Sequence, residues 1–543
     1  MQGLMMDWPL TLPSILEHAA LYHPDREVVA RTVEGPIHRY GYAEALARTK
    51  RLANALLALG VKPGDRVATL AWSTHRHFEL YFAATGIGAV LHTINPRLHP
   101  DQVAWVANHA EDTVLLFDVT FADLVAETAP KMLSVKTLVA LTDRAHLPAN
   151  APAATLVYEE LLAQASPELA WPKLDEQAAC GLCYTSGTTG NPKGVLYSHR
   201  STVLHALACA LPDNFDFSAA DVILPCAQMY HANAWGTPYA APLVGAKLVL
   251  PGRALDGKSV SELIEAEGVT FVLGVPTIWV GVAEHLEQAG RTLGTVKTIA
   301  IGGSAPTAAL IERIEARLGG QVQQIWGMTE TSPLGVINKP LPQHAGESAA
   351  AATQRKLKQG RGLWGVELRV IDEAGAPLPR DGRSAGRLQV KGPWVACAYF
   401  KHEGAASFAE DGWFDTGDIA TLDAEGFLRL TDRAKDVIKS GGEWISTLDL
   451  EDAVCSHPAV AMAAAVGMPH PKWDERPLLL VMLRPGQSAE PEALKAHVAE
   501  RVAKWWVPDE VRIVSELPIG PTGKVLKREL RDRLATATPV PAE

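Results

Sequence analysis

Cysteine and positive charge are both scarce in this sequence. Six cysteines in 543 residues are too few for a disulfide framework, which is typical of a protein in a reducing cytosol. The formal net charge is −11 and lysine and arginine form no cluster, so no nucleic-acid partner is expected. No apolar run is long enough to cross a membrane, and the N-terminal residues MQGLMMDWPL lack the basic start of a signal peptide. We therefore expect a cytoplasmic protein without an integral membrane segment.

The sequence also lacks a complete cysteine motif for metal or redox chemistry. Cys180 and Cys183 form a C-x-x-C pair, but no second pair stands at metal-binding spacing. A redox or zinc pair is the alternative that this leaves open. Both residues lie in an apolar run that leads into a loop, so two small buried core residues are the favoured interpretation.

More than one domain is expected, because 543 residues exceed what one hydrophobic core usually holds. Short apolar runs alternate with helical patterns, which predicts parallel sheets covered by helices and an α/β fold. The predicted strands are Arg66–Ala71, Val114–Phe117, Leu138–Leu141, Phe271–Leu273 and Thr298–Ile301. The predicted helices are Leu12–His23, Ala43–Leu59, Val260–Glu267 and Thr307–Leu318.

The chain changes character near Asp432, after a stretch rich in charge and glycine. The elements predicted beyond it are helices at Thr447–Ser456 and Pro491–Lys504 and strands at Val460–Val466, Leu478–Leu483 and Val511–Val514. These are enough for a small α+β domain of its own. We place the boundary between the two domains at Thr431–Lys435.

A loop dense in hydrogen-bond donors follows the apolar run that contains the two cysteines. It spans Tyr184–Gly194 and has the sequence YTSGTTGNPKG. Its glycines let several backbone N–H groups converge on one point, four hydroxyls add donors, and Lys193 adds a positive charge. This pattern favours a polyphosphate site, although its spacing is not that of a Walker A loop. A surface turn rich in glycine and threonine is the alternative.

Two further stretches carry residues suited to a nucleotide. Gln324–Ser332, QIWGMTETS, contains Glu330, and Mg²⁺ prefers one or two such oxygen ligands beside phosphate oxygens. A role for Glu330 in capping the next helix is an equal alternative. Ile301–Pro306, IGGSAP, follows a predicted strand, and its paired glycines would let a flat base or an acyl chain lie against backbone.

Three charged residues nearer the C-terminus complete the set. Asp418 is the kind of carboxylate that accepts hydrogen bonds from paired ribose hydroxyls, and Arg433 could bind ribose or phosphate. Lys524 stands on a glycine turn, from which a lysine can enter a separate site as a mobile charge. Taken singly, each is as well explained by an exposed ion pair or a solvated surface lysine.

Together these stretches resemble the adenylate-forming superfamily, which includes acyl-CoA synthetases, luciferases and nonribosomal-peptide adenylation domains. The likeness covers nearly the whole chain, because the stretches occur in the order and spacing of that superfamily. The chain looks most like the medium- and long-chain fatty-acyl-CoA ligase branch, and it is also similar to bacterial ligases for 3-methylmercaptopropionate. The stretches that carry this finer likeness are Val90–Leu98, Met229–Gly236, Lys439–Ser446 and Pro469–Pro477.

The resemblance implies a fold, a reaction and a set of partners. The expected fold is a large N-terminal domain of helix-covered sheets with a small β-barrel-like subdomain (residues 1–431), a hinge (432–435) and a small mobile α+β domain (436–543). A carboxylate would attack Mg-ATP to give acyl-AMP and pyrophosphate, and the thiol of coenzyme A would then give acyl-CoA and AMP. A homodimer is expected from the same likeness.

The resemblance also assigns roles to residues at matching positions. Lys524, His231 and Glu330 are the expected catalytic residues, and Thr185 and Glu330 the expected Mg²⁺ ligands. Trp326 would stack on adenine, where many relatives have tyrosine. The expected ATP- and AMP-binding residues are Thr185, Ser186, Gly187, Thr188, Thr189, Gly190, Lys193, Gly303, Ser304, Trp326, Gly327, Met328, Thr329, Asp418 and Arg433.

Acyl binding and the second half-reaction are assigned in the same way. Lys435 would be the hinge that withdraws Lys524 and brings in the face that binds coenzyme A. The expected acyl-binding residues are His231, Trp235, Gly302 and Pro333, with Trp235 resembling the gate of an acyl tunnel. The expected residues on the coenzyme A side are Lys439, Gly441, Gly442 and Trp444. Because Met229–Gly236 carries no charged residue, a monocarboxylate with an apolar tail is favoured.

Other functions are weighed against this one. A short thioether or aryl acid is the alternative substrate within the same class. A luciferase-like monooxygenase shares the first half-reaction, and a carrier-protein loading module differs only in its acceptor. An inactive nucleotide-binding scaffold is the alternative from another class, and Thr185, Glu330, Asp418 and Lys524 argue against it.

Overall fold

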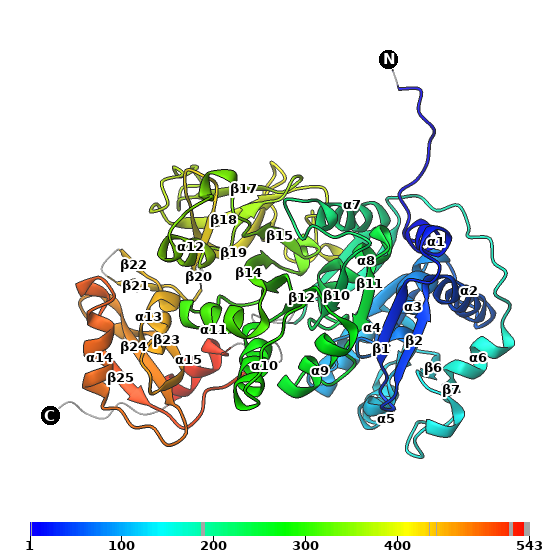
Figure 1. Ribbon diagram of the computed structural model, residues 1–543, viewed down its shortest axis with the longest axis horizontal. Coiled ribbons are helices and arrows are strands. Elements are labelled where there is room, and N and C mark those ends of the chain that lie inside the picture. The colour runs from blue at the N-terminus through cyan, green and yellow to red at the C-terminus, as the bar shows by residue number, and fades with distance from the viewer. Residues whose placement is uncertain (2, 186–190, 434, 441–442, 521–524, 537–543) are drawn as a thin grey trace.

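The computed structural model describes residues 1–543 except residues 2, 186–190, 434, 441–442, 521–524 and 537–543. A large body and a smaller C-terminal lobe lie side by side, and the N-terminal segment extends away from the body (Figure 1). Eight of the predicted site residues lie outside the described part: Ser186, Gly187, Thr188, Thr189, Gly190, Gly441, Gly442 and Lys524. The side chain of Trp444 also lies outside it.

One large sheet has nine strands in the described part of the chain, in the order β16-β15-β14-β13-β12-β10-β11-β1-β2. Its interior strands pair in parallel, whereas β2, β15 and β16 run antiparallel at the two ends. The strands are β1 Glu27–Arg31, β2 Ile37–Gly41, β10 Val222–Pro225, β11 Lys247–Leu250, β12 Phe271–Gly274, β13 Thr298–Ile301, β14 Gln321–Gly327, β15 Leu334–Ile337 and β16 Arg361–Gly362.

The second large sheet has seven described strands, in the order β7-β6-β5-β3-β4-β8-β9. All its pairs are parallel except β8 with β9, which form a hairpin that carries the donor-rich loop. The strands are β3 Arg66–Leu70, β4 Val90–Thr93, β5 Asp112–Phe117, β6 Thr137–Ala140, β7 Leu156–Val157, β8 Ala179–Tyr184 and β9 Gly194–Ser198.

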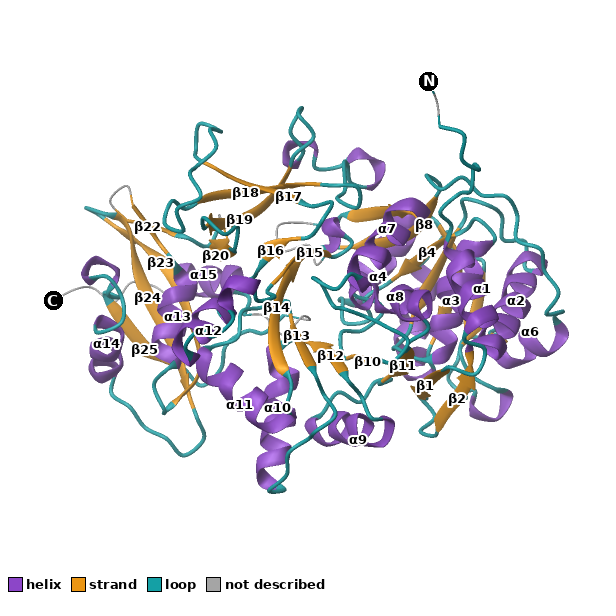
Figure 2. Ribbon diagram, turned by 45° about the horizontal axis from the view of Figure 1, so that its top comes forward, coloured by secondary structure: helices purple, strands orange, loops and turns teal. Residues whose placement is uncertain are grey.

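Helices form layers between the two sheets and outside each of them (Figure 2). One buried cluster unites inward side chains of both sheets with helices α1, α2, α3, α7 and α8. A second cluster joins α9, α10 and α11 to the outer face of the nine-stranded sheet, and a third joins α4 and α5 to the outer face of the other. The helices of the body are α1 Leu12–Tyr22, α2 Tyr42–Ala58, α3 His75–Gly86, α4 Pro100–Ala110, α5 Ala122–Thr128, α6 Tyr158–Gln164, α7 His199–Ala210, α8 Thr237–Val244, α9 Gly257–Glu267, α10 Pro276–Gln288, α11 Ala308–Leu318 and α12 Ala349–Lys356.

Two smaller sheets lie beyond the body's large sheets in the sequence. The expected barrel-like part contains a four-stranded antiparallel sheet of β17 Glu367–Ile371, β18 Gly386–Lys391, β19 Phe414–Leu422 and β20 Leu428–Arg433. The C-terminal lobe holds a sheet of β21 Ile438–Ser440, β22 Glu443–Ile445, β23 Val460–His470, β24 Asp474–Leu483 and β25 Glu510–Ile513. Its helices are α13 Thr447–Cys455, α14 Pro491–Ala499 and α15 Lys527–Thr536.

The α/β fold, with a large N-terminal domain and a small α+β domain, is therefore confirmed.

Local signals explain where helices near the site begin. The Thr307 side chain accepts a hydrogen bond from the backbone of Leu310 at the start of α11, and Ser198 does the same for Ser201 at the start of α7. Among the described residues, no helix has the length and apolarity needed to span a bilayer.

Candidate functional site

Most of the predicted nucleotide residues lie where parallel strands end. Gly303 and Ser304 come directly after β13, Trp326 to Thr329 extend from the end of β14 into the loop beyond it, and Thr185 comes directly after β8. The carboxyl ends of strands in open α/β sheets are where ligands usually bind. Asp418 and Arg433 come instead from β19 and β20, where they are cross-strand neighbours.

Asp418 joins two other predicted nucleotide residues. It is 2% exposed, and its Oδ2 accepts a hydrogen bond from the indole Nε1 of Trp326 at 3.0 Å. Its Oδ1 lies 2.8 Å from Nε of Arg433. Both carboxylate oxygens are thus held in fixed directions by donors from two different sheets. An oriented carboxylate beside a flat indole is suited to a ribose and its base.

Glu330 is a buried carboxylate near this group. It lies in the short 3-10 helix η5, Thr329–Thr331, is 4% exposed, and its Oε1 accepts a hydrogen bond from the hydroxyl of Tyr399 at 2.5 Å. Burial raises the pKa of Glu330, and the Tyr399 hydrogen bond and nearby Arg433 oppose that rise. Among the described residues, no lysine, arginine or histidine forms an ion pair with Glu330. A desolvated carboxylate of this kind is suited to a divalent cation.

Lys193 and Thr185 close the base of the donor-rich loop. The backbone N–H of Thr185 donates to the carbonyl of Lys193 at 2.9 Å, and the N–H of Lys193 donates to Oγ1 of Thr185 at 3.2 Å. The ammonium of Lys193 lies 5.0 Å from the ring centroid of Tyr399. Tyr399 therefore touches both the predicted metal ligand and the predicted phosphate-binding lysine.

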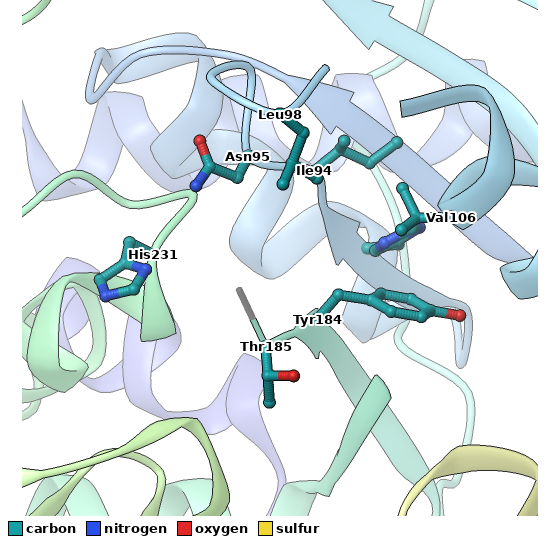
Figure 3. A pocket seen from close by; sticks show the side chains of 8 residues that line it. Ile94, Asn95, Leu98, Val106, Tyr184, Thr185 and His231 are labelled. Carbon is teal, nitrogen blue, oxygen red and sulfur yellow. The ribbon is translucent and has the colours of Figure 1, made fainter. Parts of the chain in front are cut away.

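His231 and Thr185 line one pocket (Figure 3). Tyr184, Ile94, Asn95 and the other lining residues come from β4, the loop after it, α4 and β8. His231 is exposed rather than packed in the core. The full set of lining residues is His92, Ile94, Asn95, Leu98, Val106, Tyr184, Thr185 and His231.

The predicted acyl residue Trp235 packs against Gly302, which directly precedes the predicted adenine residues Gly303 and Ser304. Trp235 is 7% exposed, and a Cβ added to Gly302 would lie 2.7 Å from its indole ring and 2.8 Å from Ile325. Only glycine at 302 therefore leaves room for this indole. Pro333 is buried beyond η5. The acyl and nucleotide residues thus meet at the end of β13.

The predicted hinge residue and the coenzyme A side contact residues of the C-terminal lobe. Lys435 is exposed, and its carbonyl accepts a hydrogen bond from Arg531 of α15 at 3.1 Å. Lys439 is also exposed, and its N–H donates to Oε2 of Glu475 at 2.9 Å.

One residue of the site, Tyr399, was not predicted from the sequence. It carries no motif of its own and meets Glu330 from 69 positions away.

Two family models match this chain. An AMP-binding enzyme model matches residues 16–400, and an AMP-binding enzyme C-terminal domain model matches residues 449–524. The first match lies within the large body and the second within the small lobe.

Three characterised relatives are similar over nearly their whole length. A medium-chain fatty acid–CoA ligase from Ectopseudomonas oleovorans is 47% identical over 98% of this chain and 97% of the relative. A 3-methylmercaptopropionyl-CoA ligase from Ruegeria lacuscaerulensis is 45% identical over 99% of each chain. A long-chain fatty acid–CoA ligase from Thermus thermophilus is 48% identical over 97% of this chain and 96% of the relative.

Solved structures share the fold. An anthranilate CoA ligase in complex with anthranoyl-AMP superposes with a TM-score of 0.87 at 24% identity, covering 98% of this chain and 99% of that one. An o-succinylbenzoate CoA synthetase from Bacillus subtilis, in complex with ATP and magnesium ion, superposes with a TM-score of 0.79 at 27% identity, covering 95% of this chain and 99% of that one.

Proposed function

Because this chain belongs to the AMP-binding enzyme family, we propose that it uses ATP to join a medium- to long-chain fatty acid to coenzyme A. A carboxylate oxygen of the acid bonds to the α-phosphorus of ATP, and pyrophosphate leaves. The thiol sulfur of coenzyme A then bonds to the acyl carbon, AMP leaves with the electron pair of the broken C–O bond, and the thiol loses its proton. The products are acyl-CoA, AMP and pyrophosphate.

The main support for this proposal is that the predicted nucleotide residues and the predicted acyl residues adjoin each other. Buried Asp418 contacts both Trp326 at the end of β14 and Arg433, and buried Glu330 follows three positions after Gly327, the last residue of that strand. Trp235 of the uncharged segment Met229–Gly236 lies against Gly302, directly after β13. Polar groups for a nucleotide and an apolar wall for an acid tail therefore adjoin each other. Adenylation needs this proximity, because both reactants must be aligned in one site.

Magnesium fits this site. The carboxylate of Glu330 is buried and forms no ion pair among the described residues, and the Thr185 hydroxyl lies at the base of the donor-rich loop. We propose that these two residues hold the ion together with phosphate oxygens. Bound there, Mg²⁺ would supply charge neutralisation at the triphosphate.

The chain's own residues have no nucleophilic role in this scheme. The first step brings an anion to a polyanion, so positive charge and alignment are what the site must provide. We propose that Lys193, whose ammonium lies over the ring of Tyr399, binds the phosphates, and that Asp418, which is ion-paired with Arg433, binds the ribose. We propose that Lys524 bridges the carboxylate and the α-phosphate, and that His231 lies beside the reacting acyl group.

The small lobe is proposed to serve both half-reactions. It would rotate about Lys435, with residues 1–431 and 436–543 on either side of the hinge at 432–435. In one position Lys524 reaches the triphosphate. In the other, the face with Lys439, Gly441, Gly442 and Trp444 approaches for the attack by coenzyme A.

A short thioether acid is the second candidate substrate. The relative from Ruegeria lacuscaerulensis, which is named for 3-methylmercaptopropionate, is nearly as similar to this chain as the relatives named for fatty acids. A panel of straight-chain acids from two to eighteen carbons, with 3-methylmercaptopropionate and benzoate, separates the candidates when acyl-CoA and AMP are both measured. Highest kcat/KM for acids of eight or more carbons is expected. A maximum at 3-methylmercaptopropionate would replace the fatty acid.

The assembly and location are also proposals. Leu4, Met5, Met6 and Trp8 are exposed on the N-terminal segment, which extends away from the body (Figure 1). Exposed apolar groups of this kind commonly mark a contact surface. We propose that the segment packs on a second copy to give a cytoplasmic homodimer. Light scattering should give twice the 58.3 kDa chain mass, and W8S should lower it.

A further inference from the structure

The segment that carries Trp235 has an unusual backbone. Ala232, Asn233, Ala234, Trp235 and Gly236 have φ values of +41°, +55°, +47°, +59° and +76°. Four consecutive residues with side chains are therefore in the left-handed region, where the Cβ crowds the following carbonyl oxygen. Such a turn persists only where the surrounding structure holds it, and strain of this kind is typical of functional sites.

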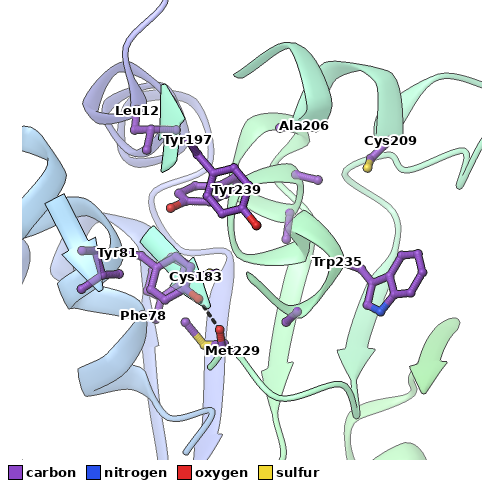
Figure 4. Close-up of a cluster of buried hydrophobic side chains, with 14 of the residues drawn as sticks. Leu12, Phe78, Tyr81, Cys183, Tyr197, Ala206, Cys209, Met229, Trp235 and Tyr239 are labelled. Atoms are coloured by element: carbon purple, nitrogen blue, oxygen red, sulfur yellow. Dashed lines mark hydrogen bonds between the residues drawn. The ribbon is translucent and has the colours of Figure 1, made fainter. Parts of the chain in front are cut away.

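Tyr81 of α3 holds the start of this left-handed turn. Its hydroxyl donates a hydrogen bond to the carbonyl of Met229 at 2.5 Å and lies 3.2 Å from Oδ1 of Asn233. Figure 4 shows the hydroxyl directed at Met229 from within the buried cluster. Tyr81 is fully buried and packs against the ring of Tyr239 with centroids 5.4 Å apart, so the hydroxyl has a fixed position. One side chain thus anchors two points on either side of His231.

The far end of the turn rests on His205 of α7. A Cβ at Gly236 would lie 2.7 Å from the His205 ring, so only glycine fits there. Burial lowers the pKa of His205 to about 3, which keeps the ring neutral, and its Nε2 accepts a hydrogen bond from the N–H of Leu334 at 3.1 Å. One end of the turn is therefore held by Tyr81 of α3, and the other end packs on His205, which also accepts a hydrogen bond from Leu334, just beyond Gln324–Ser332. Trp235 lies within the turn, against Gly302.

We propose that Tyr81 is a positioning residue whose hydroxyl holds the left-handed turn and thereby fixes where Trp235 limits the acyl site. The inference rests on the proposed function, because it concerns which acids that site accepts. Without the hydroxyl, the carbonyl of Met229 and Oδ1 of Asn233 lose their contact with Tyr81. One of the interactions that hold the turn in its left-handed conformation is then missing. The turn then relaxes toward ordinary backbone, and the indole leaves Gly302.

The variant Y81F tests this inference, because it removes the hydroxyl and keeps the ring. The matched control is Y42F, since Tyr42 is also fully buried and its hydroxyl donates to a backbone carbonyl, that of Ala246, at 2.6 Å. Each variant loses one tyrosine–carbonyl hydrogen bond, so similar decreases in thermal midpoint are expected. Only Y81F changes a bond to the turn.

Two readouts decide the outcome. The first is amide hydrogen exchange in residues 229–237 of the full chain without substrate, which should be faster in Y81F and unchanged in Y42F. The second is the ratio of kcat/KM for a twelve-carbon acid to that for a four-carbon acid. This ratio should change about fivefold in Y81F, the size expected for one lost hydrogen bond, while KM for ATP stays within about twofold.

The results distinguish this inference from the proposed function. Unchanged exchange in Y81F would overturn the structural part, whatever the activity. Faster exchange with an unchanged acid ratio would overturn the role in selectivity. If the wild-type chain forms no acyl-CoA from any acid, the proposed function fails, and the exchange measurement still reports whether Tyr81 holds the turn.

Discussion

The indole Nε1 of Trp326 donates a hydrogen bond to Oδ2 of Asp418 at 3.0 Å, across 92 positions of the sequence. The bond joins the end of β14 in the nine-stranded sheet to β19 in the antiparallel sheet. It places a flat ring beside an oriented carboxylate. The ring would stack on the base of a nucleoside, and the carboxylate would accept hydrogen bonds from its ribose hydroxyls. Tyrosine at position 326 would offer no N–H in this direction.

Replacing Trp326 by phenylalanine tests this relationship. W326F keeps an aromatic face but leaves Asp418 held by Arg433 alone. Loss of a hydrogen bond to a charged group should raise KM for ATP about tenfold or more, with a smaller effect on KM for the acid. The control is W279F, in a buried tryptophan of α10 whose indole N–H has no partner among the described residues. An equal change in both variants would mean that the bond has no role in nucleotide binding.

Magnesium dependence should vary with the protonation of Glu330. Burial raises the pKa of this carboxyl, so a proton competes with the metal as the pH falls through that raised pKa. The Mg²⁺ concentration for half-maximal adenylation should therefore increase between pH 8 and pH 5.5 in the wild type. In E330Q it should be high at both values, because no ionised carboxylate forms.

The matched control for this experiment is E347Q. Glu347 is ion-paired with Arg355 in the same domain and has no place in the site. Its variant should keep the wild-type magnesium curve at each pH. A wild-type curve in E330Q would remove Glu330 from the metal site.

Lys524 should be needed for only one half-reaction. K524A removes the ammonium proposed to bridge the acid and the α-phosphate, so acid-dependent formation of acyl-AMP should fall by about a thousandfold, the scale typical of single charge-stabilising groups. Formation of acyl-CoA from supplied acyl-AMP should stay within about threefold of wild type. K495A in the same lobe serves as the control. Equal loss of both half-reactions in K524A would contradict the rotating lobe.

Local patterns were enough to predict much of the fold. Runs such as Phe271–Leu273 and Thr298–Ile301 are short, apolar and succeeded by helical patterns, and they form parallel strands β12 and β13. The helix predicted at Pro491–Lys504 ends instead at Ala499. Glu500 and Arg501 form a turn beyond it, and Lys504 begins a separate 3-10 helix, Lys504–Trp506.

Contacts between distant parts of the chain could not be predicted in the same way. Nothing near Glu330 in the sequence indicates that Tyr399 will meet it, because that contact depends on how the antiparallel sheet packs on the body. The left-handed turn is similar. Asn233 is tolerant of positive φ, but alanine and tryptophan are not, so local preference argues against the conformation that Tyr81 and His205 impose.

Acid-dependent exchange of labelled pyrophosphate into ATP, measured without coenzyme A, tests the central claim most directly. It reports whether the site that contains Asp418, Trp326 and Glu330 adenylates a carboxylate reversibly. We predict exchange that depends on both Mg²⁺ and a fatty acid of eight or more carbons, with AMP release only after coenzyme A is added. Absence of exchange with every acid of the panel, in a folded chain that still binds ATP, would contradict the account.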